Sequence, residues 1–175
     1  HENIITMWAC FHDESRVFMV MDVADKGDLC MVLEAEPSRR FNDIQTISVI
    51  LQLTKAMKFI HNKGIIHRDI KPENLLVAAN DQVKLGDFGW AVYHRNGQRL
   101  PPCGIRNNMA PEMFNNDHFY DYTVDLWAIG VLAYHLVVGM NPFISEDEGM
   151  IEKICTADYF FPSFVSQDCE DFITQ

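Results

Sequence analysis

The sequence has few basic residues for its size. Lysine and arginine together number 14 against 25 aspartates and glutamates, which gives a formal net charge of -11. A phosphate backbone and an anionic membrane surface both attract positive charge, so this balance argues against binding to nucleic acid and to such membranes. Two interpretations stay open: an acidic surface that keeps the protein in solution, or a surface that favours basic protein substrates.

Paired cysteines and long apolar runs are also lacking. The cysteines are odd in number, widely spaced and without a C-x-x-C pair: Cys10, Cys30, Cys103, Cys155 and Cys169. This pattern indicates neither a zinc site nor a disulfide framework, and it favours a reducing compartment, so we expect an intracellular protein of the cytoplasm or the nucleus. The most apolar run, residues 126–138, is shorter than a membrane span and contains His135, and it predicts a buried helix.

The order of apolar and polar residues predicts strands first and then mostly helices. With 175 residues and 48% hydrophobic content, the chain can form one sizeable core. Strands are expected at residues 5–11 and 17–23, the second of them buried, and at the two arms of a hairpin, 75–77 and 83–85. Further helices are expected at three places: residues 124–138, 145–156 and from 167 onward. Together these elements predict a mixed α+β fold.

The longest predicted helix runs to His61 from Asn42 or Asp43, either of which could cap it. Gly64 follows at a position that suits a left-handed backbone after a helix. The expected buried side of this helix consists of six residues: Ile44, Ile47, Ile50, Leu51, Met57 and Ile60. A shorter helix is expected to begin after Asp28.

Two acidic motifs are the most informative part of the sequence. Residues 67–74 read His-Arg-Asp-Ile-Lys-Pro-Glu-Asn, and Asp87-Phe88-Gly89 begins thirteen residues after Asn74. Asp69, Asn74 and Asp87 supply hard oxygen ligands of the kind that Mg²⁺ prefers, and a carboxylate can also orient an attacking hydroxyl. The spacing therefore predicts a magnesium-phosphate reaction centre.

Two more motifs follow, Ala110-Pro111-Glu112 and the residues 125–130, Asp-Leu-Trp-Ala-Ile-Gly. The four motifs, in this order and at this spacing, resemble those of the eukaryotic protein kinases. Residues 68–76, 87–90 and 124–127 resemble the Aurora branch of that family in particular. The resemblance implies a protein-kinase-like fold and a serine/threonine kinase that transfers the γ-phosphate of ATP, with Mg²⁺, to hydroxyl groups of protein substrates.

The resemblance also implies roles for individual residues. Asp69 would accept or orient the proton of the substrate hydroxyl, and Lys71 would neutralise charge on the transferred phosphate, as a lysine at this position does in serine/threonine kinases. Asn74 and Asp87 would bind the metal ions. Packing roles, without a part in the chemistry, are implied for four residues: His67, Phe88, Met7 and Asp125.

Six residues are assigned by the resemblance to the nucleotide or the substrate: Met21, Asp22, Ala24, Asp28, Glu73 and Leu76. The first of these would control the depth of the nucleotide pocket, the next two belong to the hinge whose backbone binds adenine, and Leu76 would pack under the base. Asp28 would lie near the ribose, and together with Glu73 it could attract a basic residue of the substrate. A carboxylate at this position could equally stabilise the start of a helix, so Asp28 has a structural alternative.

Some features of the family are missing. No glycine-rich phosphate loop occurs, and no lysine precedes Lys26. We therefore expect a domain truncated at both ends, in which residues 1–24 are a remnant of the small lobe with the hinge and residues 25–175 are an incomplete, mostly helical large lobe. The family pairs the glutamate at position 112 with a downstream arginine, but no arginine follows Arg106. Glu112 is therefore expected to be a buried carboxylate without its partner.

The segment between the second and third motifs, from Gly89 to Pro111, departs from the family pattern. Between Gly89 and Pro111 there is no serine or threonine, although in the family Arg68 commonly pairs with a phosphorylated residue there. We therefore expect no switching by serine or threonine phosphorylation in this segment. Ile105 and Asn108 replace a threonine and a tyrosine, which we expect to loosen the site and to weaken catalysis.

Two other functions stay open. A pseudokinase that acts as a binding module would explain Ile105 and Asn108. A small-molecule phosphotransferase of the same fold is disfavoured by residues 71–73 and 110–112. The sequence does not predict the oligomeric state.

Overall fold

A computed structural model describes residues 1–94, 100, 106–115, 119–144 and 149–175. The strands, in chain order, are β1 (Met7–His12), β2 (Val17–Met21), β3 (Ile65–Ile66), β4 (Leu75–Val77), β5 (Val83–Leu85) and β6 (Val92–Tyr93). The α-helices are α1 (Leu29–Ala35), α2 (Asp43–His61), α3 (Thr123–Val138), α4 (Gly149–Thr156) and α5 (Gln167–Ile173). Three short 3-10 helices are η1 (Pro72–Asn74), η2 (Arg106–Asn108) and η3 (Pro111–Phe114). This is the mixed α+β fold that the sequence predicts.

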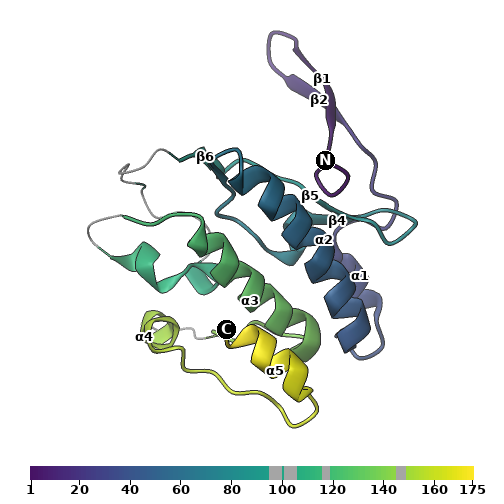
Figure 1. The fold of residues 1–175 in the computed structure, drawn as a ribbon. Helices are drawn as coiled ribbons and strands as arrows, with labels where there is room; N and C mark the ends of the chain where they lie inside the picture. Colours follow the sequence, from purple (N-terminus) through teal and green to yellow (C-terminus); the bar gives the residue numbers. More distant parts are fainter. Residues whose placement is uncertain (95–99, 101–105, 116–118, 145–148) are drawn as a thin grey trace.

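The strands β1 and β2 form an antiparallel hairpin that extends away from the helices (Figure 1). The predicted strands at residues 5–11 and 17–23 are confirmed, but the predicted burial of the second is wrong. Val17, Met19 and Val20 are all exposed. A two-stranded ribbon hides its side chains only when another layer covers it, and Figure 1 shows no described element lying against this ribbon.

The hairpin of β4 and β5 is confirmed, and it is flanked by backbone from two earlier parts of the chain. On one side, the Ile5 amide donates to the Leu85 carbonyl at 2.9 Å, and the Leu85 amide donates to the Asn3 carbonyl at 3.0 Å. On the other side, the Val77 amide donates to the Gly27 carbonyl at 2.8 Å. The hairpin therefore connects the segments before β1 and after β2 to the main body.

The helix α2 begins with a capping box, and three of the six residues expected on its buried side are buried: Ile50, Met57 and Ile60. Asn42 is the cap: its Oδ1 accepts from the Gln45 amide, and the Gln45 side chain accepts from the Asn42 amide. The buried residues are Thr46, Val49, Ile50, Leu53, Ala56, Met57 and Ile60. The predicted burial of Ile44, Ile47 and Leu51 is wrong, and Ile44 is 81% exposed. Apolar residues occur on both sides of this helix, and its contacts with α3 and β5 decide which side is covered.

The core lies between α2 and α3, which pass side by side through the body (Figure 1). Leu53 and Ala56 of α2 pack in one cluster with Leu132 and Leu136 of α3, and all four are almost completely buried. The buried helix predicted at residues 126–138 is thus confirmed. Helices are also confirmed at Gly149–Thr156 and Gln167–Ile173, while residues 145–148 lie outside the described part.

One pairing was not predicted. The strand β6, which follows Asp87 in the chain, pairs with β3 through Ile65 opposite Tyr93 and Ile66 opposite Val92. The pair follows the left-handed Gly64 (φ 73°), which ends the turn after α2 as expected. It holds both ends of the segment that contains residues 67–74 and 87–89 close together.

Candidate active site

The loop between β3 and η1 carries the carboxylate expected to be catalytic. Asp69 is 4% exposed, and its Oδ2 receives two contacts: Lys71 Nζ at 2.9 Å and Asn74 Nδ2 at 2.7 Å. Asn74 Nδ2 also donates to the Asp69 backbone carbonyl at 2.8 Å, which closes the loop on itself. The structure therefore brings three of the four predicted reaction-centre residues into direct contact.

The fourth residue, Asp87, is brought to the same end of the β4–β5 hairpin. The amide of Gly86, just before it, donates to the Asn74 carbonyl at 2.8 Å. Asp87 has a left-handed backbone (φ 50°), and its exposed carboxylate accepts from the Gly89 amide at 3.1 Å. A non-glycine residue in this conformation is uncommon and is a frequent feature of functional sites.

The donor set suits a hard cation completed by phosphate. In the described part of the chain, no three His, Cys, Asp or Glu side chains gather as a self-sufficient metal site. The amide nitrogen of Asn74 donates to Asp69, so its Oδ1 is the atom that remains for a cation. The carboxylate of Asp87 is the second candidate ligand. Mg²⁺ is commonly bound by one or two protein oxygens together with substrate phosphates, and these two residues fit that requirement.

A buried aspartate on α3 accepts hydrogen bonds from the backbone of the loop. Asp125 on α3 is fully buried and accepts from the amides of His67 (2.9 Å) and Arg68 (2.8 Å) and contacts His61 Nε2 at 2.8 Å. The packing role expected of Asp125 is confirmed. His61 was missed, because its only signal in the sequence is its place at the end of α2.

His67 is a packing residue, as predicted. Its ring is fully buried, packs edge-on against Phe88 with ring centroids 4.9 Å apart, and places Nε2 3.0 Å from the Gly86 carbonyl. Burial lowers the pKa of His67 below its ordinary value, so the imidazole is neutral at neutral pH. Met7, which was expected in the same stack, is instead exposed on the β1–β2 hairpin.

Arg68 has a left-handed backbone (φ 67°) and a side chain engaged with the segment after Asp87. Its Nε donates to the Trp90 carbonyl at 2.9 Å, and its Nη1 donates to the Tyr120 hydroxyl at 2.8 Å. Ile105 lies outside the described residues. Asn108, the other departure from the family pattern, accepts a hydrogen bond from Asn141 Nδ2 at 2.7 Å.

The residues assigned to the nucleotide surround the β4–β5 hairpin. Met21 ends β2, and the segment with Asp22 and Ala24 follows it before the chain pairs with β4. Asp28 caps α1 by accepting from the Met31 amide at 2.9 Å, and its backbone bridges to Leu76. The structural alternative for Asp28 is thus confirmed, and its role near the ribose stays a prediction. Glu73 is exposed on η1.

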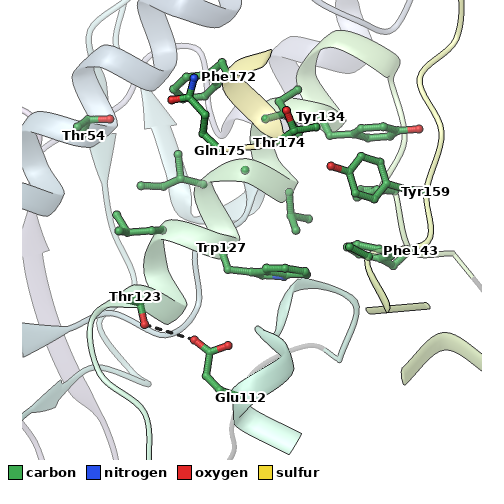
Figure 2. Close-up of a pocket in the computed structure, with 17 residues that line it drawn as sticks. Thr54, Glu112, Thr123, Trp127, Tyr134, Phe143, Tyr159, Phe172, Thr174 and Gln175 are labelled. Atoms are coloured by element: carbon green, nitrogen blue, oxygen red, sulfur yellow. Dashed lines mark hydrogen bonds between the residues drawn. The ribbon is translucent and has the colours of Figure 1, made fainter. Parts of the chain in front are cut away.

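Glu112 lines a cavity of about 540 Å³ between α3, η3 and the last residues of the chain (Figure 2). Aromatic walls come from Trp127, Tyr134, Phe143 and Tyr159. The expectation of a buried carboxylate is wrong, because Glu112 is only partly buried, and its Oε1 lies 3.3 Å from the Thr123 hydroxyl oxygen. Water in the cavity can solvate the other carboxylate oxygen.

Comparison with known proteins decides the family. The protein kinase domain family matches residues 1–175. This chain belongs to the protein kinase family. Over its whole length it is 38% identical to an Aurora kinase of Encephalitozoon cuniculi, 38% identical to Aurora kinase A-A of Xenopus laevis and 41% identical to an Aurora kinase of Candida glabrata. These similarities confirm the resemblance to the Aurora branch.

The kinase chain spans 65%, 42% and 49% of the lengths of these three relatives. Membership of the protein kinase family implies ATP and a divalent metal ion as cofactors. Among the described helices, none is both long and apolar enough to cross a membrane.

Proposed function

We propose that the protein containing this chain is a serine/threonine kinase that uses ATP with Mg²⁺ and phosphorylates serine and threonine hydroxyls of protein substrates. The observation that carries the proposal is the buried Asp69 carboxylate, held by Lys71 and Asn74 within one short loop. The similarity to proteins named Aurora kinases supports it, and the comparisons favour neither the pseudokinase nor the small-molecule phosphotransferase.

Asp69 is suited to orient a hydroxyl. Both contacts to its carboxylate end at Oδ2, and among the described residues none ends at Oδ1. Oδ1 is therefore the oxygen that would accept the hydrogen bond of the substrate hydroxyl, with Oδ2 fixed by its two partners. Holding the carboxylate in one position removes the cost of orienting it during the reaction.

Lys71 and the metal ion held by Asn74 and Asp87 would neutralise the negative charge of the phosphate groups. ATP bound with Mg²⁺ would supply the transferable phosphoryl group and neutralise part of its charge. Asn74 Oδ1 and the carboxylate of Asp87 would hold the metal. Lys71, 2.9 Å from Asp69, would neutralise charge on the transferred phosphate.

The nucleotide base would lie between the hinge and the β4–β5 hairpin. We propose that the backbone of residues 22–24 binds adenine, that Met21 limits the depth of the pocket, and that Leu76 packs under the base. Glu73 and Asp28, in a chain of net charge -11, would favour basic residues in the substrate.

Residues 1–24 would belong to the small lobe and residues 25–175 to the large lobe. The free thiols of Cys10, Cys30, Cys155 and Cys169 support an intracellular location.

The test is phosphate transfer by the full-length gene product. With MgATP and a generic basic protein, the wild type should incorporate phosphate into serine and threonine. Asp69→Asn should lower kcat by about 10²- to 10⁴-fold, because the oriented acceptor is lost while ATP binding is kept. Glu34→Gln, on the exposed surface of α1, is the control and should match the wild type. Nucleotide binding without transfer would instead indicate a pseudokinase, and transfer only to small molecules would indicate the phosphotransferase.

A further inference from the structure

The side chain of Asp22, at the start of the proposed hinge, is held from three directions. Its Oδ1 accepts from Trp8 Nε1 at 2.9 Å, and its Oδ2 accepts from the Thr6 amide at 3.1 Å and from Lys84 Nζ at 2.7 Å. These donors come from the segment before β1, from β1 and from β5. A single carboxylate thus connects the β1–β2 hairpin to the β4–β5 hairpin.

A bulge in β1 gives Trp8 this orientation. Met7 pairs with Met21 and Ala9 pairs with Val20, so Trp8 is an extra residue without a partner across the ribbon. A bulge of this kind re-aims the side chain of the extra residue. Trp8 is 70% exposed, so burial of its ring does not explain the orientation, whereas the hydrogen bond to Asp22 does.

The ion pair with Lys84 is shielded from solvent. The side chains of Lys84 and Asp22 are 17% and 16% exposed, whereas those of the nearby pair Lys26 and Asp81 are 40% and 79% exposed. Ion pairs at the surface contribute little and are screened by salt, and a shielded pair is screened much less. The hydrogen bond from Lys84, followed by that from the Thr6 amide, holds the pKa of Asp22 well below its ordinary value.

The position of Lys84 on β5 connects this pair to the proposed nucleotide slot. Lys84 lies directly opposite Leu76 in the register of β4 and β5. Directly opposite residues of an antiparallel pair project to the same face of the sheet. The face that carries Leu76 is therefore the one from which Lys84 reaches Asp22. This contact, together with the backbone bonds that join Lys26 and Gly27 to Val77, places the hinge relative to Leu76.

We propose that Trp8, Asp22 and Lys84 form a positioning network that fixes the hinge at the spacing from Leu76 that a flat adenine base requires. The proposal rests on the proposed function, since it concerns the same nucleotide site. The three side chains act on the hinge backbone and do not themselves contact the reacting atoms. Loss of the network should weaken nucleotide binding more than it slows the transfer step.

The test measures the affinity of the full-length protein for a fluorescent ATP analogue. Asp22→Ala and Lys84→Met should each raise its Kd by about tenfold. The Kd of the double variant should be no higher than that of either single variant, because each substitution already removes the same contact. In kinetic assays they should raise KM for ATP more than they lower kcat. Trp8→Phe changes an exposed residue, so it should fold normally, and it should raise Kd by about threefold.

Asp13→Ala is the matched control. Asp13 is also a carboxylate held by several donors in the β1–β2 hairpin, from Ser15 and Arg16, but it lies at the far turn. Its replacement should leave the Kd unchanged. An unchanged Kd in folded Lys84→Met and Trp8→Phe would overturn the network, and so would an equal rise in Asp13→Ala.

A second measurement separates this proposal from the proposed function. In protein labelled with ¹⁵N-tryptophan, the Trp8 indole N–H signal is identified by its absence in Trp8→Phe. Asp22→Ala should shift it upfield without nucleotide, because the charged acceptor is gone, while Asp13→Ala should not. If the wild type binds no nucleotide, the proposed function fails, and the indole signal still decides whether the network exists. An unshifted signal in Asp22→Ala would refute it.

Discussion

Replacement of Asp125 by alanine should destabilise the protein strongly. The carboxylate is fully buried and accepts from the backbone amides of His67 and Arg68 at 2.9 and 2.8 Å, with His61 as a third partner at 2.8 Å. Alanine would leave both amides in the interior without an acceptor.

The magnitude follows from these two donors. A buried donor without its acceptor costs about 1–3 kcal/mol, so Asp125→Ala should lower the free energy of unfolding by about 2–6 kcal/mol. The free energy of unfolding of a typical domain is roughly 5–15 kcal/mol, so this loss is a large part of it. Asp121 is the matched control, because it accepts from the amide and hydroxyl of Thr123 at the start of α3 near the surface. Asp121→Ala should cost only about 1 kcal/mol, because its hydrogen bonds are exposed and water can replace them.

Urea unfolding followed by tryptophan fluorescence measures both variants. Hydrogen exchange adds a local readout: the amides of residues 67 and 68 should exchange faster in Asp125→Ala and not in Asp121→Ala. A loss below about 1 kcal/mol in Asp125→Ala would refute the reasoning, since it would mean that the two amides find other acceptors. Retained protection at residues 67 and 68 would have the same meaning.

Four further changes test other parts of the fold. Gly139→Ala should lower the free energy of unfolding by roughly 1–3 kcal/mol, because the backbone is left-handed (φ 90°) and the new Cβ would lie 2.9 Å from a backbone carbonyl. Gly130→Ala, within α3, would place its new Cβ at an ordinary contact distance of 3.8 Å from the Ile173 carbonyl, and it should be neutral or slightly stabilising in a thermal unfolding assay. Asn42→Ala removes the capping box of α2 and should cost about 1 kcal/mol, and an unchanged melting temperature would contradict the cap. The pKa of Asp22 lies below its ordinary value of 3.8, so its stabilisation is present above that pH and is lost as the pH falls below it. The stability difference between the wild type and Asp22→Ala should therefore shrink in acid, and a constant difference down to about pH 2 would argue against the shift.

The local parts of the site could be predicted from the sequence, because their residues are close together in the chain. Asp69, Lys71 and Asn74 lie within six residues, and the loop that joins them needs no distant partner to be recognised. Contacts between remote segments could not be predicted. Lys84 is 62 residues from Asp22, and neither residue belongs to a motif that indicates the other.

The burial of side chains was predicted least well, and the reason is physical. The helix α2 has apolar residues on two sides, so periodicity alone could not choose between the side of Ile44 and the side of Leu53. The strand β2 has the apolar run of a buried strand, but burial depends on a covering layer that a run of residues does not reveal. The pair of β3 and β6 was missed because two-residue strands carry no periodic signal.

The exposed β1–β2 ribbon has a consequence for handling the isolated chain. Among the described residues, no third strand pairs with either outer edge of this ribbon, and its surfaces carry Trp8, Phe11, Val17 and Met19. An apolar ribbon with open edges is a template onto which further strands can add, which is how many proteins aggregate. Residues 1–175 produced alone should therefore precipitate through this ribbon, even though the core between α2 and α3 is well packed.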